Sequence, residues 1–261
     1  MVQKLVLFDK IYNIGKERNK KEIIHRYLNY LNNYVKGFPN TSVEVKKIRD
    51  FDKRPEIIIT GPEEYFILNL LKKEIGIISD FKDLKVGEIY KGILVDVGKV
   101  GFGLFADCAI LNPKVDVLIN LHTLRRQLCA GKKNSLRNII EAYNFIDNFP
   151  VYVKINKIDI INNKLQGELA EHTLSLFNKI LKDNLEGVFL SGDTKGQFKK
   201  AITKKGHFRD IITIEQFGFL ENIALFKEGT NAPGIIAHIG SQLESTKLSA
   251  LRPERIKKLF I

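Results

Sequence analysis

Apolar side chains recur at steps of three and four between residues 16 and 36, and this period predicts a helix with one buried face. Gly37 and Pro39 end that pattern, and Pro62 suits the first turn of a second helix. Short apolar runs bounded by turn residues predict strands around these helices. The predicted elements of residues 1–82 are a strand at 2–8, a helix at 16–36, strands at 42–49 and 56–60, and a helix at 63–74. This βαββα order is typical of helices packed on a small sheet.

The last third of the chain repeats this alternation over more elements. Its predicted elements are a helix at 171–184, a strand at 187–190, a helix at 197–204, strands at 210–217 and 220–227, a helix at 232–243 and a strand at 247–251. After the leading helix the order is βαββαβ, which is the ferredoxin-like order. We therefore predict a ferredoxin-like domain over residues 170–261, a fold that does not by itself indicate a function.

Between these segments, glycines alternate with apolar residues in a way that is typical of strongly curved strands. The run begins LKVGEIYKG, and Gly87 and Gly92 fall where a tightly coiled strand has no room for a side chain. Further on, Phe102–Asp107 reads FGLFAD and Val115–Ile119 reads VDVLI. The closing run PVYVKINKIDIINNKLQGEL carries Asp159 at its turn.

These four features, in this order, resemble the OB-fold RNA-binding domain that is repeated in the bacterial ribosomal protein S-one. The resemblance covers residues 83–169, about a third of the chain, and implies a five-stranded barrel that presents strands two and three to single-stranded RNA. The sequence also departs from that family, because two extra residues precede the Phe-Gly pair. Val117 and Asn120 stand where the family has a glycine and an RNA-facing histidine. The connection at 122–149 is longer than usual and reads as a basic insertion that contains a helix.

The resemblance implies that Phe102, Phe105, Asp107 and Asn120 lie at the RNA-binding face. Bases stack on exposed aromatic rings in single-strand-binding proteins. Because Phe102 and Phe105 are three residues apart, strand alternation places them on opposite faces, so one ring should be a stacking platform and the other part of the core. We assign the platform to Phe105 and a weaker contribution to Asp107. The alternative is that both rings belong to the core.

Two clusters of basic residues are candidates for contacts with phosphate groups. The first lies in the insertion, where LRRQLCAGKKNSLRN contains no acidic residue; its cations are Arg125, Arg126, Lys132, Lys133 and Arg137. The second lies on the helix predicted at 197–204 and directly after it; its cations are Lys199, Lys200, Lys204 and Lys205. For each cluster the alternative is an ordinary solvated face.

The composition agrees with a protein that binds polyanions. The 261 residues include 42 Lys and Arg against 30 Asp and Glu, a formal net charge of +12. The alternative is a compositional bias toward Lys, Ile and Asn. Cys108 and Cys129 lie far apart and the five histidines show no metal-ligand spacing, so we expect two buried thiols, no metal and no cofactor. With no signal-peptide layout and no apolar run of about 20 residues, we expect a cytosolic protein that does not enter a membrane.

The sequence therefore predicts an α+β protein of three small domains: an α+β sandwich at 1–82, an OB-fold barrel at 83–169 with its insertion at 122–149, and a ferredoxin-like domain at 170–261. This layout resembles an uncharacterised archaeal family, and the alpha subunit of translation initiation factor two also combines a barrel with an α+β domain. Because no catalytic motif stands out, we expect a non-enzymatic RNA-binding protein that acts in translation or RNA processing, with ribosomal RNA or the ribosome as its candidate partner. The alternatives are an RNA-modifying or processing enzyme whose barrel delivers the substrate, and a ligand-sensing regulator that uses the last domain.

Overall fold

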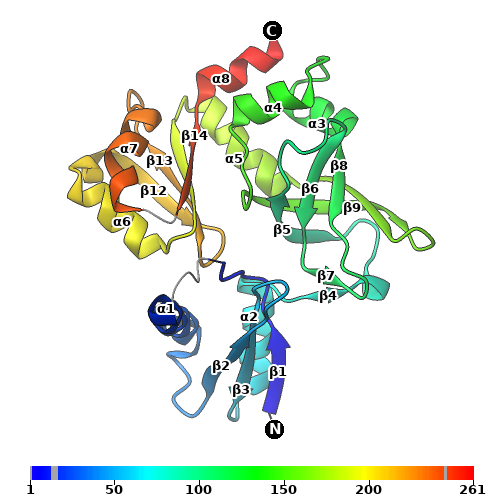
Figure 1. Cartoon of the computed structure of the whole chain (residues 1–261), viewed down its shortest axis with the longest axis vertical. Coiled ribbons are helices and arrows are strands. Elements are labelled where there is room, and N and C mark those ends of the chain that lie inside the picture. Colours follow the sequence, from blue (N-terminus) through cyan, green and yellow to red (C-terminus); the bar gives the residue numbers. More distant parts are fainter. Residues whose placement is uncertain (1, 13–16, 244–245) are drawn as a thin grey trace. The chain divides into compact units, whose positions relative to one another are not determined.

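The computed structural model describes residues 2–12, 17–243 and 246–261 (Figure 1). The chain forms two compact units. The first consists of Met1–Ile78 with Gly218–Leu220, and the second of Ser79–Phe217 with Glu221–Ile261. Among the described residues, none of the helices is both long and apolar enough to cross a membrane. The predicted α+β fold class is confirmed.

The first unit has the predicted βαββα order. Its elements are β1 (Val2–Val6), α1 (Glu17–Val35), β2 (Ser42–Ile48), β3 (Pro55–Thr60) and α2 (Glu64–Glu74). The three strands form an antiparallel sheet in the order β1-β3-β2. Both helices bury an apolar face in the core of this unit, with Tyr27 and Leu31 from α1 and Ile67 from α2.

The turn that joins β2 to β3 buries two charged side chains, Asp52 and Arg54. Arg49 donates a hydrogen bond to Asp52 Oδ2 at 2.7 Å, and the Arg54 backbone N–H donates to Asp52 Oδ1 at 3.2 Å. The Arg54 guanidinium donates to the carbonyl oxygen of Phe8. The sequence predicted strands at 42–49 and 56–60, and the charged residues between them also hold the turn against the chain that follows β1.

Tyr27→Phe should destabilise the first unit by about 1–3 kcal/mol, because it removes the hydrogen bond that the Tyr27 hydroxyl donates to the buried Asp9 carboxylate at 3.2 Å. Burial and then the Asp9 charge raise the pKa of Tyr27 well above its usual value. The stabilisation by this phenol is therefore complete below its ordinary pKa of about 10 and is lost as the pH rises toward the folded-state pKa. In thermal melts between about pH 8 and pH 11, the wild type should lose more stability than Tyr27→Phe. Parallel curves would contradict this assignment.

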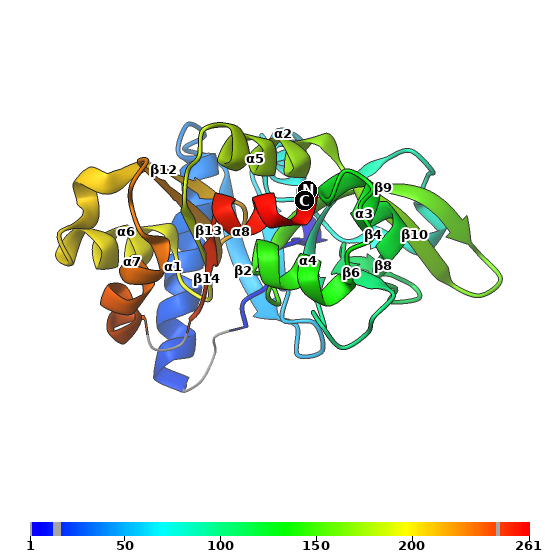
Figure 2. The same cartoon turned by 90° about the horizontal axis from the view of Figure 1, so that it is seen from above.

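The second unit begins with a barrel that closes through five strands (Figures 1 and 2). These strands are β5 (Ile89–Val95), β6 (Gly103–Asp107), β8 (Val117–Asn120), β9 (Pro150–Asp159) and β10 (Lys164–Leu169). Their order, β10-β8-β6-β5-β9, includes one parallel pair, β8 with β10, and agrees with the five-stranded barrel predicted from the sequence. A separate parallel pair joins β4 (Ser79–Asp80) to β7 (Ile110–Leu111). β4 and the short helix η1 (Phe81–Asp83) precede the first barrel strand, whereas β7 lies between β6 and β8 in the chain.

The insertion between β8 and β9 forms two helices, α3 (Leu121–Leu128) and α4 (Leu136–Tyr143). Asn120 and Ser135 cap them, because each side-chain oxygen accepts a backbone N–H from the first turn of its helix. The apolar faces of both helices belong to the same core as the barrel. The insertion is therefore a packed part of the unit and not a loose basic loop.

The remaining elements form a four-stranded sheet with helices on both faces. They are α5 (Glu171–Lys182), β11 (Gly187–Ser191), α6 (Lys195–Lys204), η2 (His207–Asp210), β12 (Ile211–Gln216), β13 (Glu221–Phe226), α7 (Ala232–Ile239), η3 (Gly240–Gln242), β14 (Lys247–Leu251), α8 (Pro253–Lys257) and η4 (Lys258–Phe260). The sheet is antiparallel in the order β12-β13-β11-β14, which is the predicted ferredoxin-like arrangement. Helices α6 and α7 cover one face, and α5 lies on the other, between the sheet and the barrel (Figure 1).

The barrel and the C-terminal sheet share one apolar core. The ring of Phe149, which precedes β9, lies 4.8 Å from the ring of Phe189 on β11 and 6.2 Å from that of Phe177 on α5, between centroids. All three rings are buried. The sequence predicted separate domains at 83–169 and 170–261, but in the structure these segments pack as one unit, because the sheet face that α6 and α7 leave open is covered by α5 and the barrel.

Candidate nucleic-acid interface

Strand register places a row of side chains across the outside of the barrel. Val95 on β5 pairs with Phe105 on β6, Phe105 pairs with Leu118 on β8, and the row continues to Gln166 on β10 and Lys157 on β9. The strand neighbours that precede Val95 and follow Phe105 are buried in the barrel instead. We call these five residues the barrel strip. It is apolar on β5, β6 and β8 and polar on β10 and β9.

Phe102 adds a second aromatic ring to the barrel strip. It lies in the bend before β6 and is 56% exposed. Its ring meets the half-buried ring of Phe105 edge to face, with centroids 6.1 Å apart and planes at 87°. The prediction that the two rings point to opposite faces is wrong, because alternation holds only inside a regular strand and Phe102 lies outside β6. Phe102, and not Phe105, therefore offers the more accessible stacking surface.

Gly103 allows β6 to approach β8 closely enough to fix this geometry. A Cβ atom at Gly103 would lie 2.5 Å from the Ile119 carbonyl oxygen and 3.0 Å from Asn120 Cα. Only glycine fits such a close approach of two backbones. The Leu121 N–H donates to the Phe102 carbonyl oxygen at 2.8 Å, so the Phe102 backbone is held at the point where its ring leaves the sheet.

Two connections border the barrel strip. The β5–β6 loop carries Lys99, which pairs with Asp96 at 2.6 Å. The β9–β10 hairpin extends beyond the barrel (Figures 1 and 2), and its tip exposes Ile160 and Ile161, at 76% and 92%. Two large apolar side chains at the end of a protruding hairpin cannot be explained by packing within the unit.

Three polar residues singled out in the sequence accept hydrogen bonds that hold turns or cap a helix. Asp107 is buried, and its carboxylate accepts the Ala109 N–H at 2.9 Å. Asn120 accepts the Thr123 N–H at 2.9 Å as the cap of α3. Asp159 accepts two hydrogen bonds within the turn of the β9–β10 hairpin. Asp107 and Asn120 thus have structural roles, and contact of either with RNA stays a prediction.

Two arginines of the insertion are already paired with acids. Arg126 donates to Glu168 of β10 at 2.5 Å, and Arg137 donates to Glu141 one helical turn later at 2.7 Å. The sequence of the insertion showed no acid near Arg126, since its partner lies 42 residues away. Both charges are partly neutralised, which weakens the prediction that the whole cluster contacts phosphates.

The other three cations of the insertion differ from one another. Arg125 is half-buried and donates to the carbonyl oxygen of Asn134 at 2.6 Å, which closes the loop between α3 and α4. Lys132 and Lys133 are exposed in that loop, and no ion pair to either is found among the described residues. These two lysines remain as candidate phosphate contacts of the insertion.

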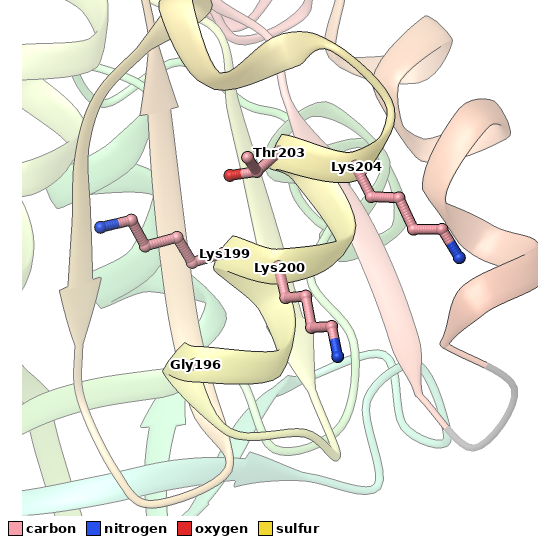
Figure 3. A pocket seen from close by; sticks show the side chains of 5 residues that line it. All are labelled: Gly196, Lys199, Lys200, Thr203 and Lys204. Carbon is pink, nitrogen blue, oxygen red and sulfur yellow. The ribbon is translucent and has the colours of Figure 1, made fainter.

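The second predicted cluster forms an exposed ridge on α6. Lys199, Lys200 and Lys204 are exposed, and Lys205 follows them at the end of the helix. Lys199, Lys200 and Lys204, together with Gly196 and Thr203, line a shallow depression of about 410 Å³ (Figure 3). The structure thus keeps all four cations of this cluster at the surface.

Both halves of the second unit match one protein family. Residues 84–180 match the DUF2110 central domain, and residues 186–251 match the DUF2110 C-terminal domain. The chain thus matches the DUF2110 family over two consecutive domains. The first match continues through most of α5, so the DUF2110 central domain includes the helix that lies between the barrel and the C-terminal sheet. No curated protein matches the sequence.

Several solved structures are similar to part of the chain. They include the uncharacterized protein MJ1198 from Methanocaldococcus jannaschii, with 17% identity over 34% of this chain and 96% of that chain at a TM-score of 0.24. GSP13 from Bacillus subtilis has 15% identity over 35% of this chain and 58% of its own, at a TM-score of 0.24. An a/eIF2alpha–aDim2p–rRNA complex from Pyrococcus horikoshii OT3 has 12% identity over 49% and 70%, at a TM-score of 0.26. At this degree of similarity, none of the three indicates what this chain binds.

Sequence reasoning missed two features of the DUF2110 central domain. Gln166 and Lys157 join the barrel strip only through strand register, which a single sequence does not reveal. Ile160 and Ile161 stood in the quoted motif, but their exposure depends on the hairpin projecting beyond the barrel. The signal in the sequence was the pair of adjacent isoleucines inside a turn, from which an exposed apolar hairpin tip could have been predicted.

Lys132→Gln combined with Lys133→Gln in the DUF2110 central domain should weaken binding to all single-stranded RNAs alike. It should flatten the plot of log affinity against log salt by about 1.4, because each phosphate contact to a single strand contributes about 0.7. Arg126→Gln, the matched control, should change the slope less, since that charge is paired with Glu168. Fluorescence anisotropy at several salt concentrations measures both slopes. Equal slopes in the double variant and the wild type would show that this loop is an ordinary solvated surface and does not contact phosphates.

Proposed function

We propose that this protein binds single-stranded RNA through the barrel strip and Phe102, and that it is not an enzyme. The proposal rests chiefly on the Phe102–Phe105 pair, in which a ring 56% exposed is supported edge to face by a second ring. A phenylalanine held in this way can stack on a base of any sequence, because every base has a π face. The ring is fixed before binding, so less entropy is lost when a base stacks on it.

Cations at the polar end of the strip supply the matching contacts for phosphates. Lys157 on β9 and Lys164 on β10 are exposed, and within the described part of the chain neither forms an ion pair. Lys132 and Lys133 add two further charges in the insertion. A groove of aromatic and basic side chains is what proteins use to bind single strands without reading their sequence. The net charge of +12 favours the same ligand.

The role in the cell is proposed from the resemblance to the S-one type of barrel. That resemblance supports RNA over DNA as the ligand and a role in translation or RNA processing, with ribosomal RNA or the ribosome as the candidate partner. Crosslinking in the host followed by sequencing of the attached RNA tests this role. The role would be supported if more ribosomal RNA is crosslinked to the wild type than to a Phe102→Ala variant. Equal recovery of RNA by both proteins would contradict it.

The affinity of the wild type for single-stranded RNA should fall steeply with salt. Four phosphate contacts would lower it roughly fifty-fold between 50 and 200 mM salt, because bound cations are released to the solution on complex formation. Anisotropy titrations of a labelled oligonucleotide measure this response. A flat response, or no binding at low salt, would overturn the proposed function.

A further inference from the structure

A second surface of interest lies on the outer layer of the C-terminal sheet, at α6 and η2. Helix α6 begins with a capping box in which Thr194 accepts the Gln197 N–H at 3.3 Å. Its inner face, formed by Phe198, Ala201 and Ile202, is buried in the core on that side of the sheet. With this face buried, every lysine of α6 lies on the exposed side of the helix.

Phe208 lies beside these lysines on η2. It is 55% exposed, and the Lys199 ammonium lies 5.8 Å from the centre of its ring, within the range of a cation–π contact. Lys199 and Thr203 extend from one side of α6, whereas Lys200 and Lys204 extend from the other (Figure 3). The ring thus stands at one edge of a ridge that carries cations on both of its sides.

Three hydrogen bonds hold η2 in place on either side of Phe208. His207 Nδ1 lies 3.0 Å from Asp210 Oδ2, and the backbone N–H of Lys227 donates to the Asp210 carbonyl oxygen at 2.9 Å. His207 Nε2 lies 2.8 Å from Nδ1 of His238, which belongs to α7, and the two imidazole rings stack with centroids 5.1 Å apart. The backbone that carries Phe208 is therefore anchored to a neighbouring helix before any ligand arrives.

We infer that Phe208 and the lysines of α6 form a second contact for single-stranded RNA, with the ring stacked on a base and the lysines on the adjoining phosphates. The inference rests on the proposed function and adds a site that is separate from the barrel strip. Residues 195–209 contain six Lys and Arg and no acidic residue, so the surface is complementary to a polyanion. An exposed ring with a cation beside it favours a nucleic acid over an acidic peptide, because a base offers a flat face to stack on.

His238 acts in this site as a positioning residue, through His207. His238→Ala should weaken RNA binding less than Phe208→Ala does, because the ring remains but its backbone loses the anchor to α7. His238→Asn, which can keep a hydrogen bond to His207, should restore most of the loss. Loss of affinity in His238→Ala without rescue by His238→Asn would contradict the positioning role.

The test uses the full chain, anisotropy titrations and two labelled RNAs, one of about six nucleotides and one of about 20, since one barrel covers about 4–16 nucleotides. Phe208→Ala should weaken binding of the long RNA by at least roughly five-fold and leave that of the short RNA nearly unchanged. Phe102→Ala should weaken the binding of both RNAs.

Ile212→Ala is the matched control, because Ile212 is 48% exposed on the neighbouring strand β12 and lies outside the basic ridge. Thermal melts verify that each variant is folded.

The outcomes separate this inference from the proposed function. If the wild type binds both RNAs and Phe208→Ala behaves like Ile212→Ala, the second contact is wrong and the barrel interface stands. If the wild type binds neither RNA, both are overturned. A third outcome would also overturn the inference. Polyglutamate would displace the long labelled RNA as effectively as unlabelled RNA does, and Phe208→Ala would abolish that competition. The surface would then bind acidic peptides.

Discussion

Phe102→Ala should weaken the binding of a short single-stranded RNA by roughly 5- to 150-fold, because stacking contributes about 1–3 kcal/mol for each base. The thermal stability of the second unit should change little, since a ring that is 56% exposed buries little apolar area. Anisotropy titrations and thermal melts of the same preparation measure the two effects. Phe105→Ala should combine a loss of affinity with some loss of stability, because Phe105 supports Phe102 and is half-buried.

A matched control for this change is Phe51→Ala in the first unit. Phe51 is 66% exposed and does not belong to the barrel, so its removal should leave RNA binding unaltered. Similar affinities for Phe102→Ala and Phe51→Ala would show that the Phe102 ring is no stacking platform. Early melting of Phe102→Ala with normal binding by the folded fraction would show instead that the ring contributes to the core.

Gly103→Ala should destabilise the second unit by about 3 kcal/mol, because a Cβ atom there would meet backbone and not a movable side chain. The atoms closest to it would be the Ile119 carbonyl oxygen at 2.5 Å and Leu118 Cδ1 at 2.8 Å. The strands β6 and β8 would have to separate, and the paired row of the barrel strip would separate with them. For a unit of this size the melting temperature should fall by about 6–12 °C.

Gly101→Ala is the control for the Gly103 variant, since the two positions are separated by one residue. A Cβ atom at Gly101 would have nothing within 4 Å. Its melting temperature should therefore stay close to that of the wild type. Equal melting temperatures for the two alanine variants would show that β6 does not need a glycine to approach β8. RNA binding by any folded Gly103→Ala protein should also be weaker, because Gly103 sets the position of Phe102.

The order of the elements could be predicted from the sequence because local periodicity decides it. The amphipathic pattern of α1 and the hairpin between β12 and β13 each depend on residues close together in the chain. Packing between distant segments was not predictable in the same way. Phe149 and Phe189 are 40 residues apart, and their contact joins two segments that the pattern separates into domains. The buried pair of Asp52 and Arg54 likewise looked like an ordinary polar turn.

The residue types of the candidate site could be predicted from the sequence, but the relative positions of their side chains were less predictable. The FGLFAD motif identified the strand that carries the aromatic pair, but the relation of Phe102 to Phe105 depended on where β6 begins. Charge counting located the basic insertion, although it could not show that Glu168 neutralises Arg126 from another strand. Phe208 could not be predicted as a site residue, because nothing in the sequence distinguishes an exposed phenylalanine from a buried one.

Cutting the chain between Ala170 and Glu171 would not release a free barrel. It would remove Phe177 and Phe189 from the ring of Phe149 and leave that aromatic surface open to water, so a shortened protein should aggregate or associate with itself. In the whole chain, the same shared surface should make the barrel and the C-terminal sheet unfold together. RNA held by either one should therefore protect both from heat and from proteases, even where it touches only one of them.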